Sequence, residues 1–124
     1  MQTVEIRRER WSQALSEFSA IHEGWLISVD VLAPALGAQP EVHDLPLVGV
    51  VLEPRNGGSI TIAAARSGVS QITHMVQSPA RIWIERTDDG ADVALQIESA
   101  DGTKTIVRFK TPALPETVDG VPRR

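Results

Sequence analysis

The chain has 124 residues and a formal net charge of −4, with 42% hydrophobic and 23% charged residues, a composition typical of one globular domain. The acidic balance argues against nucleic acid as a partner, because nucleic-acid-binding domains carry a basic patch. No apolar run approaches the roughly 20 residues that cross a bilayer. The absence of cysteine excludes disulfides and thiolate metal sites, and we expect a cytoplasmic protein.

The first segment of the chain contains the one helix that the sequence predicts. Residues 3–6 alternate like an edge strand, and residues 7–22 then follow a helical pattern that Gly24 ends. The apolar stripe of this helix consists of residues spaced by three and four, Trp11, Leu15, Phe18 and either Ile21 or His22. We expect this stripe to pack on a sheet.

The middle of the chain reads as a series of short strands. They are predicted over residues 25–33, 41–45, 47–52, 59–65 and 72–77. Prolines in residues 34–40 and Pro46 are expected to interrupt the chain between strands. Asn56-Gly57 and Ser67-Gly68 are expected to form turns.

Residues 80–111 carry the clearest pattern, three strand-like runs separated by Asp89-Gly90 and Asp101-Gly102. Asp-Gly favours two-residue hairpin loops, because both central residues then need a positive φ. Two-residue loops fix the register of both hairpins. The predicted core face collects Ile82, Ile84, Val93, Leu95, Ile97 and Ile106. The predicted opposite face is mixed and includes Arg81, Trp83, Glu85, Gln96, Val107 and Phe109.

The face around Trp83 is the predicted candidate interface, and three interpretations of it stay open. The helix or another sheet of the same chain could cover it. It could be an exposed patch that binds a second copy or another protein, since Trp and Arg are enriched at interface hot spots and sizeable apolar patches are rarely left bare. A small-molecule pocket is the third interpretation.

No catalytic, cofactor-binding or metal site is predicted. His22, His43 and His74 lie far apart in the sequence and form no metal-binding motif, and the chain contains no nucleophile elbow or phosphate loop. If the protein is instead an enzyme or a small-molecule binder, we expect a pocket between helix and sheet. Its candidate residues are Arg66, His74 and Arg108, which are polar positions on otherwise apolar strands.

Together these patterns predict an α+β fold in which an N-terminal helix packs on a curved antiparallel sheet or small β-barrel of about seven strands. Parallel crossovers are not expected, because no helix lies between the strands. Residues 1–112 form the single domain and residues 113–124 a loosely ordered tail. The predicted role is non-catalytic and depends on a protein interface, as a homodimer or with another protein.

Most of the chain resembles an uncharacterised family of short bacterial proteins. The resemblance lies in HEGWLISVDVL (His22 to Leu32) with GAQPEVHDLPLVGV (Gly37 to Val50), and in RIWIERTDDGADVALQIESADGT (Arg81 to Thr103) with RFKTPALPETVDGV (Arg108 to Val121). It implies a single domain of bacterial origin whose function is unknown. It implies no activity, cofactor or site residue.

Overall fold

The structure, a computed structural model, describes residues 1–55, 58–66 and 71–113. The predicted turns at Asn56-Gly57 and Ser67-Gly68 lie outside these residues, as do residues 114–124 of the tail predicted over residues 113–124, whereas Ala113 is the last residue of a strand. In chain order the elements are β1 (Gln2–Ile6), the 3-10 turn η1 (Arg8–Arg10), α1 (Trp11–His22), β2 (Leu26–Ala33), β3 (Gly37–Glu53), β4 (Ser59–Ala64), β5 (Ile72–Gln77), β6 (Pro79–Arg86), β7 (Asp92–Ser99) and β8 (Lys104–Ala113).

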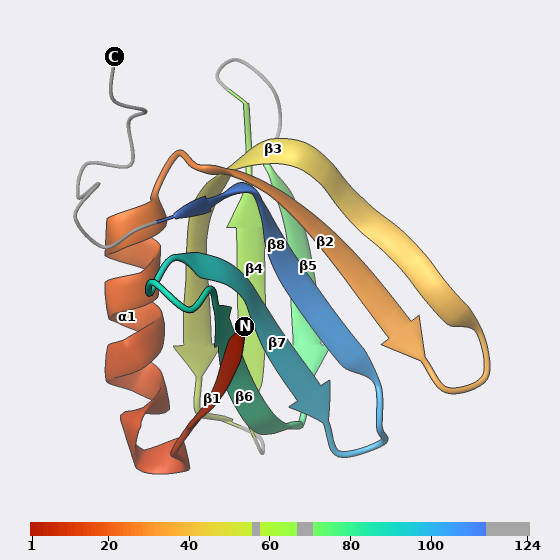
Figure 1. The fold of residues 1–124 in the computed structure, drawn as a ribbon. Coiled ribbons are helices and arrows are strands. Elements are labelled where there is room, and N and C mark those ends of the chain that lie inside the picture. The colour runs from red at the N-terminus through yellow and green to blue at the C-terminus, as the bar shows by residue number, and fades with distance from the viewer. Residues whose placement is uncertain (56–57, 67–70, 114–124) are drawn as a thin grey trace.

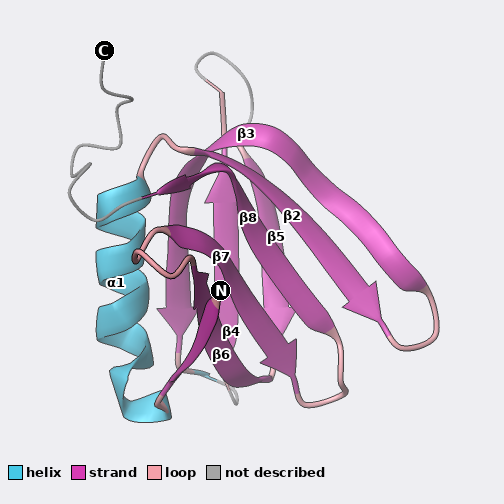
Figure 2. Ribbon diagram, viewed as in Figure 1, coloured by secondary structure: helices cyan, strands magenta, loops and turns pink. Residues whose placement is uncertain are grey.

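The eight strands form one antiparallel sheet in the order β1-β6-β7-β8-β2-β3-β4-β5. The sheet bends so that β3, β4 and β5 face the layer of β1, β6, β7, β8 and β2, and α1 stands along one side between the layers (Figures 1 and 2). β1 and β5 are the two edges, and no pairing joins them within the described residues. The α+β fold with a curved antiparallel sheet is confirmed, whereas the closed barrel and the count of about seven strands are wrong.

β3 is the element that joins the two layers. Its first part pairs with β2 and its second part with β4, so one long strand belongs to both. The sequence predicts two short strands here, with a break at Pro46. The strand instead continues through Pro40 and Pro46, and the ladder shows register shifts along this stretch, which are sites where a missing N–H is tolerated.

The helix closes the open side of the core, as its apolar stripe predicts. Trp11, Leu15 and Phe18 are buried in one cluster with the inward side chains of both layers, and each fully buried side chain of this size contributes about 1.5–3 kcal/mol. Ser19 fixes the helix to β3, because its hydroxyl accepts from Val50 N at 2.8 Å and donates to Val50 O at 3.0 Å. α1 therefore packs against the strand that connects the layers.

In the first Asp-Gly hairpin the residues around Trp83 pair as predicted, although the loop differs from the predicted one. Its loop has three residues rather than two, because Thr87 N donates to Ala91 O at 2.9 Å. A register shift near the end of β6 absorbs the additional residue. Trp83 therefore lies opposite Gln96, as predicted.

The second Asp-Gly hairpin differs from the prediction by one residue. Its loop also has three residues, closed by Ser99 N donating to Thr103 O at 2.8 Å. The paired residues that follow continue without a shift as far as Ala94. Gln96 consequently lies opposite Ile106 and not opposite Val107.

This one-residue difference exchanges the faces of β8. Val107 (0% exposed) and Phe109 (7% exposed) point into the core, and Ile106 takes the outer side opposite Gln96. The prediction that Val107 and Phe109 share a face with Trp83 is therefore wrong, as is the placement of Ile106 on the core face.

Candidate functional site

The outer surface of β6 and β7 carries the remaining predicted interface residues, Arg81, Trp83, Glu85 and Gln96. Trp83 is half-buried, and the Arg81 guanidinium lies 5.8 Å from the centroid of its ring and 3.7 Å from Glu5 Oε2 on β1. The same face continues to Arg108, whose Nη1 lies 2.8 Å from Asp30 Oδ2. These charges are already paired within the chain, so burying them under a partner would carry a desolvation cost.

The residues predicted to line a pocket are Arg66, His74 and Arg108. Arg66 is exposed and donates to Asp44 O at 3.1 Å. His74 is half-buried on β5, with Nδ1 4.0 Å from Glu41 Oε1. Arg108 lies on the outer face of β8. None of the three lines either hollow described below. His74 is paired with the buried Ile62 and so lies on the inner side of β5, and Arg66 follows the end of β4.

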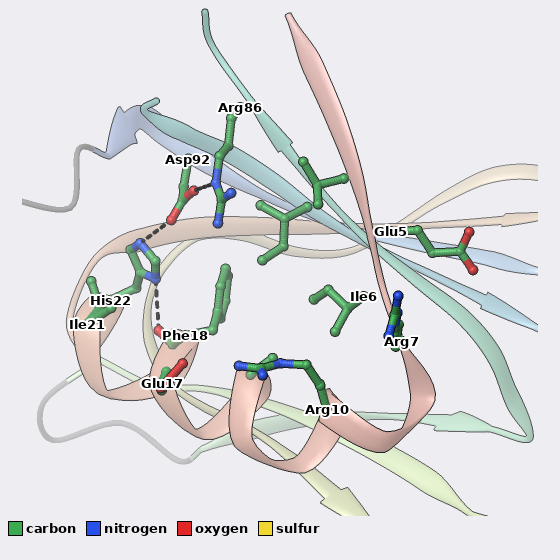
Figure 3. A pocket seen from close by; sticks show the side chains of 13 residues that line it. Glu5, Ile6, Arg7, Arg10, Glu17, Phe18, Ile21, His22, Arg86 and Asp92 are labelled. Carbon is green, nitrogen blue, oxygen red and sulfur yellow. Dashed lines mark hydrogen bonds and ion pairs between the residues drawn. The ribbon is translucent and has the colours of Figure 1, made fainter. Parts of the chain in front are cut away.

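A chain of polar contacts is instead buried at the end of α1. The His22 side chain, only 2% exposed, lies with Nδ1 2.8 Å from Phe18 O and Nε2 3.2 Å from Asp92 Oδ2. Arg86 Nε donates to the other carboxylate oxygen of Asp92 at 2.8 Å (Figure 3). Both ring nitrogens of His22 therefore lie beside oxygen atoms of the same chain.

Asp92 holds this chain together electrostatically. Burial by itself would raise its pKa, but the side-chain contacts with His22 and Arg86 and their positive charge outweigh burial, so the pKa of Asp92 lies below its ordinary value. The Nε2 contact is close without being aligned as a hydrogen bond, and Nε2 has no other partner among the described residues. The His22–Asp92 pair is therefore a close polar contact, whereas the Arg86–Asp92 pair is a hydrogen-bonded ion pair.

Aromatic rings fix the position of His22. Its ring centroid lies 4.6 Å from that of Phe18, 4.5 Å from that of Phe109 and 6.2 Å from that of Trp25. Phe109 reaches this cluster because β8 has the register described above. The ring is consequently held in one place by packing on several sides.

A cavity of about 420 Å³ opens beside these residues, between α1 and strands β1 and β6. Ile6, Phe18 and Ile84 form an apolar part of its wall. The polar residues of the lining are Glu5, Arg7, Arg10, Glu17, His22, Arg86 and Asp92. In Figure 3, Arg86 and Arg10 extend toward the cavity from opposite sides, and Glu5 points away from it.

A second feature lies on the outer surface of the other layer, which we call the β3–β5 face and define as Val48, Val51, Ser59, Thr61, Ala63 and Met75. Val51 and Met75 are 61% and 54% exposed, and they lie in one row across the sheet, on either side of Thr61. A shallow hollow of about 550 Å³ follows the small side chains of β4 between them. Glu53 is the one charged residue that lines it.

The sequence contained a signal for His22, one of the three residues of the polar chain at the end of α1, none of which was predicted as a site. His22 continues the apolar stripe of the helix four residues after Phe18, and a polar residue on a buried stripe needs a partner. Asp92 and Arg86 gave no such signal, because they are paired only when the loop of the first hairpin has three residues instead of the predicted two.

Two further properties bear on function. Among residues 1–55, 58–66 and 71–113, no group of three His, Asp or Glu side chains is placed to hold a metal ion. No helix in the described part of the chain is long and apolar enough to cross a membrane.

Comparison with known proteins agrees with the resemblance seen in the sequence. A family described as "Family of unknown function (DUF5335)" matches residues 2–117. An "Uncharacterized protein" of Aquifex aeolicus (strain VF5) is 26% identical over 116 residues, which cover 93% of this chain and 97% of that protein. No solved structure matches the chain. The predicted resemblance to an uncharacterised bacterial family is confirmed.

Proposed function

The chain belongs to the DUF5335 family, whose function is unknown, and we propose that it acts through a protein interface, as a homodimer in which two β3–β5 faces pack together. The observation that carries this proposal is the exposure of Val48, Val51 and Met75 on one side of one layer. Apolar patches of this kind mark interaction sites more often than they stay bare.

The shape of the β3–β5 face supports a second copy as its occupant. β4 presents the small side chains Ser59, Thr61 and Ala63, and the longer Val51 and Met75 rise on the strands at either side. A twofold axis near β4 and β5 would place Met75 of each copy over the small residues of the other. Such an isologous contact uses the same ridge and the same groove twice.

Charge supports the same occupant. Two copies of one chain with a net charge of −4 repel each other, and a contact surface with few charges adds the least to this repulsion. Glu53 at the margin is the one charged residue that lines the hollow, whereas the face around Trp83 carries paired charges that a partner would have to desolvate. The proposed homodimer therefore uses the β3–β5 face in place of the Trp83 face.

We extend the proposal to a cytoplasmic, non-catalytic role, in which the dimer presents its remaining surfaces to other molecules. A cysteine-free sequence suits a reducing compartment, although it does not require one. Cell fractionation with an antibody to the chain tests this part directly, and recovery of the protein outside the cytoplasmic fraction contradicts it.

Light scattering on a gel-filtration column tests the homodimer. The wild-type protein is expected at twice the 13.5 kDa mass of one chain. Met75→Glu and Val51→Glu each place a charge at the centre of the proposed interface and are expected to give the mass of one chain. Both side chains are more than half exposed, so the substitutions leave the fold of a single copy intact.

Two control variants make this experiment specific. Leu36→Glu introduces the same charge at an apolar residue that is 72% exposed in the turn between β2 and β3, and it should remain a dimer. Trp83→Ala should also remain a dimer. A wild-type monomer contradicts the homodimer, and a dimer that Trp83→Ala dissociates while Met75→Glu does not would assign the interface to the Trp83 face.

A further inference from the structure

The cavity between α1 and strands β1 and β6 has the size and composition of a ligand site. Its volume of about 420 Å³ lies within the roughly 300–1,000 Å³ that is usual for small-molecule pockets. Ile6, Phe18 and Ile84 offer an apolar wall, and charged side chains converge beside it. A few convergent polar groups on an apolar wall are typical of such sites.

The charges around the cavity do not cancel. Glu5 is engaged with Arg81 at 3.7 Å, and it points away from the cavity (Figure 3). Asp92 balances Arg86, whose Nε lies 2.8 Å from its carboxylate.

Arg7 and Arg10 supply the positive excess, because neither makes an ion pair among residues 1–55, 58–66 and 71–113. Glu17 is the remaining carboxylate of the wall, and it accepts a long hydrogen bond from Gln13 Nε2 at 3.4 Å. The cavity therefore has more positive than negative charge left to bind a ligand.

We propose that this cavity binds a small amphipathic carboxylate. The carboxylate lies between the guanidinium groups of Arg86 and Arg10, and the hydrocarbon part lies against Phe18, Ile6 and Ile84. Arg86 is oriented for this task, because its Nε is bound to Asp92 at 2.8 Å and its terminal nitrogens have no hydrogen-bond partner in the described part of the chain. Guanidinium groups match carboxylates in charge and in planar geometry.

Titration calorimetry with sodium octanoate as the probe tests this site on the full-length chain. Octanoate is expected to bind saturably at one site per chain, whereas 1-octanol and octylammonium, which have the same number of carbon atoms, bind far more weakly. Equal binding of octanoate and 1-octanol, or no saturable octanoate binding, overturns the proposal.

Substitutions at the cavity give effects of opposite sign. Arg10→Ala is expected to weaken octanoate binding by about tenfold or more, as loss of a charge-assisted contact does. Glu17→Gln removes a carboxylate that repels the carboxylate of the ligand, so this variant is expected to bind octanoate more tightly than the wild-type protein. Arg66→Ala, an exposed arginine away from the cavity, serves as the matched control and should bind like wild type. Unchanged affinity in Arg10→Ala overturns the assignment.

This site is independent of the homodimer, because the cavity and the β3–β5 face share no lining residue. Met75→Glu should therefore bind octanoate with the affinity of the wild-type protein whatever its oligomeric state. Loss of octanoate binding in Met75→Glu contradicts this independence. A wild-type protein that is monomeric and binds octanoate overturns the homodimer and leaves the ligand site standing.

Discussion

Replacing Asp92 by alanine tests the buried polar chain at the end of α1. The substitution removes the carboxylate that contacts both His22 and Arg86. Removing one partner of a fully buried ion pair costs about 3–5 kcal/mol. The cost here should be smaller, because Arg86 is 38% exposed and can be hydrated. His22 stays buried without its carboxylate neighbour, and the cost of one unsatisfied buried group is about 1–3 kcal/mol.

Urea unfolding at pH 7 measures this cost. With a slope of about 1–3 kcal/mol per molar urea, Asp92→Ala is expected to lower the midpoint by about 1 M. All samples need one protein concentration, since association would otherwise shift the midpoint.

The matched control is Asp88→Ala. Asp88 makes an equally short ion pair, 2.7 Å to the N-terminal ammonium group, but its side chain is 85% exposed, and exposed pairs contribute about 0–1 kcal/mol. The reasoning fails if Asp92→Ala lowers the midpoint no more than Asp88→Ala does.

Three further predictions test the fold and its dependence on pH. Leu95→Ala, at a side chain with no exposure in the core, should lower the free energy of unfolding by about 2–5 kcal/mol in urea titration, and a loss below about 1 kcal/mol would contradict its placement. Cysteines at Gln96 and Ile106, which are paired neighbours, should form a disulfide on mild oxidation. Cysteines at Gln96 and Val107 should not, because they point to opposite faces, and the reverse result would restore the register predicted from sequence. Because its pKa is lowered in the folded state, Asp92 stabilises the fold above its unfolded pKa of about 3.9, and this contribution is lost as the pH falls through the folded pKa. Asp92→Asn should therefore lose less stability than wild type between pH 5 and the acid limit of folding, and parallel pH profiles would refute this.

Local patterns predicted the elements well, because each depends on neighbours in the sequence. The stripe from Trp11 to Phe18 gave the helix and its buried side, and alternation in residues 25–33 gave β2. The predicted elements that were wrong depend on contacts with other strands. Pro40 and Pro46 end strands as a rule, but the long strand β3 tolerates them because it changes its partner from β2 to β4 along this stretch.

The two Asp-Gly turns show that the local sequence of a turn does not determine the register of its hairpin. Both sequences favour the same two-residue loop, and both form three-residue loops with glycine in the left-handed region, at φ 92° for Gly90 and 89° for Gly102. Only the first hairpin has a register shift that restores the expected pairing around Trp83. That shift depends on packing of the whole sheet, so identical local signals gave one correct and one incorrect register.

The candidate sites were harder to predict than the fold. His22, Arg86 and Asp92 come together from α1, β6 and β7, and no spacing in the sequence connects them. The apolar character of residues 47–52 and 72–77 was visible, yet exposure of Val51 and Met75 depends on which side of the bent sheet faces outward. Arg66, His74 and Arg108 were chosen for polarity alone, which does not determine the direction of a side chain.

The proposed interface can be tested most directly by oxidation of the two methionines of the chain. In a single copy Met1 and Met75 are 69% and 54% exposed, so hydrogen peroxide should oxidise both at similar rates. In the proposed homodimer Met75 is covered by the partner, whereas Met1 is not. Peptide mass spectrometry of the wild-type protein should then show Met75 oxidised at least several-fold more slowly than Met1, with the protection lost in Val51→Glu. Equal oxidation rates of Met1 and Met75 at high protein concentration would contradict the proposal.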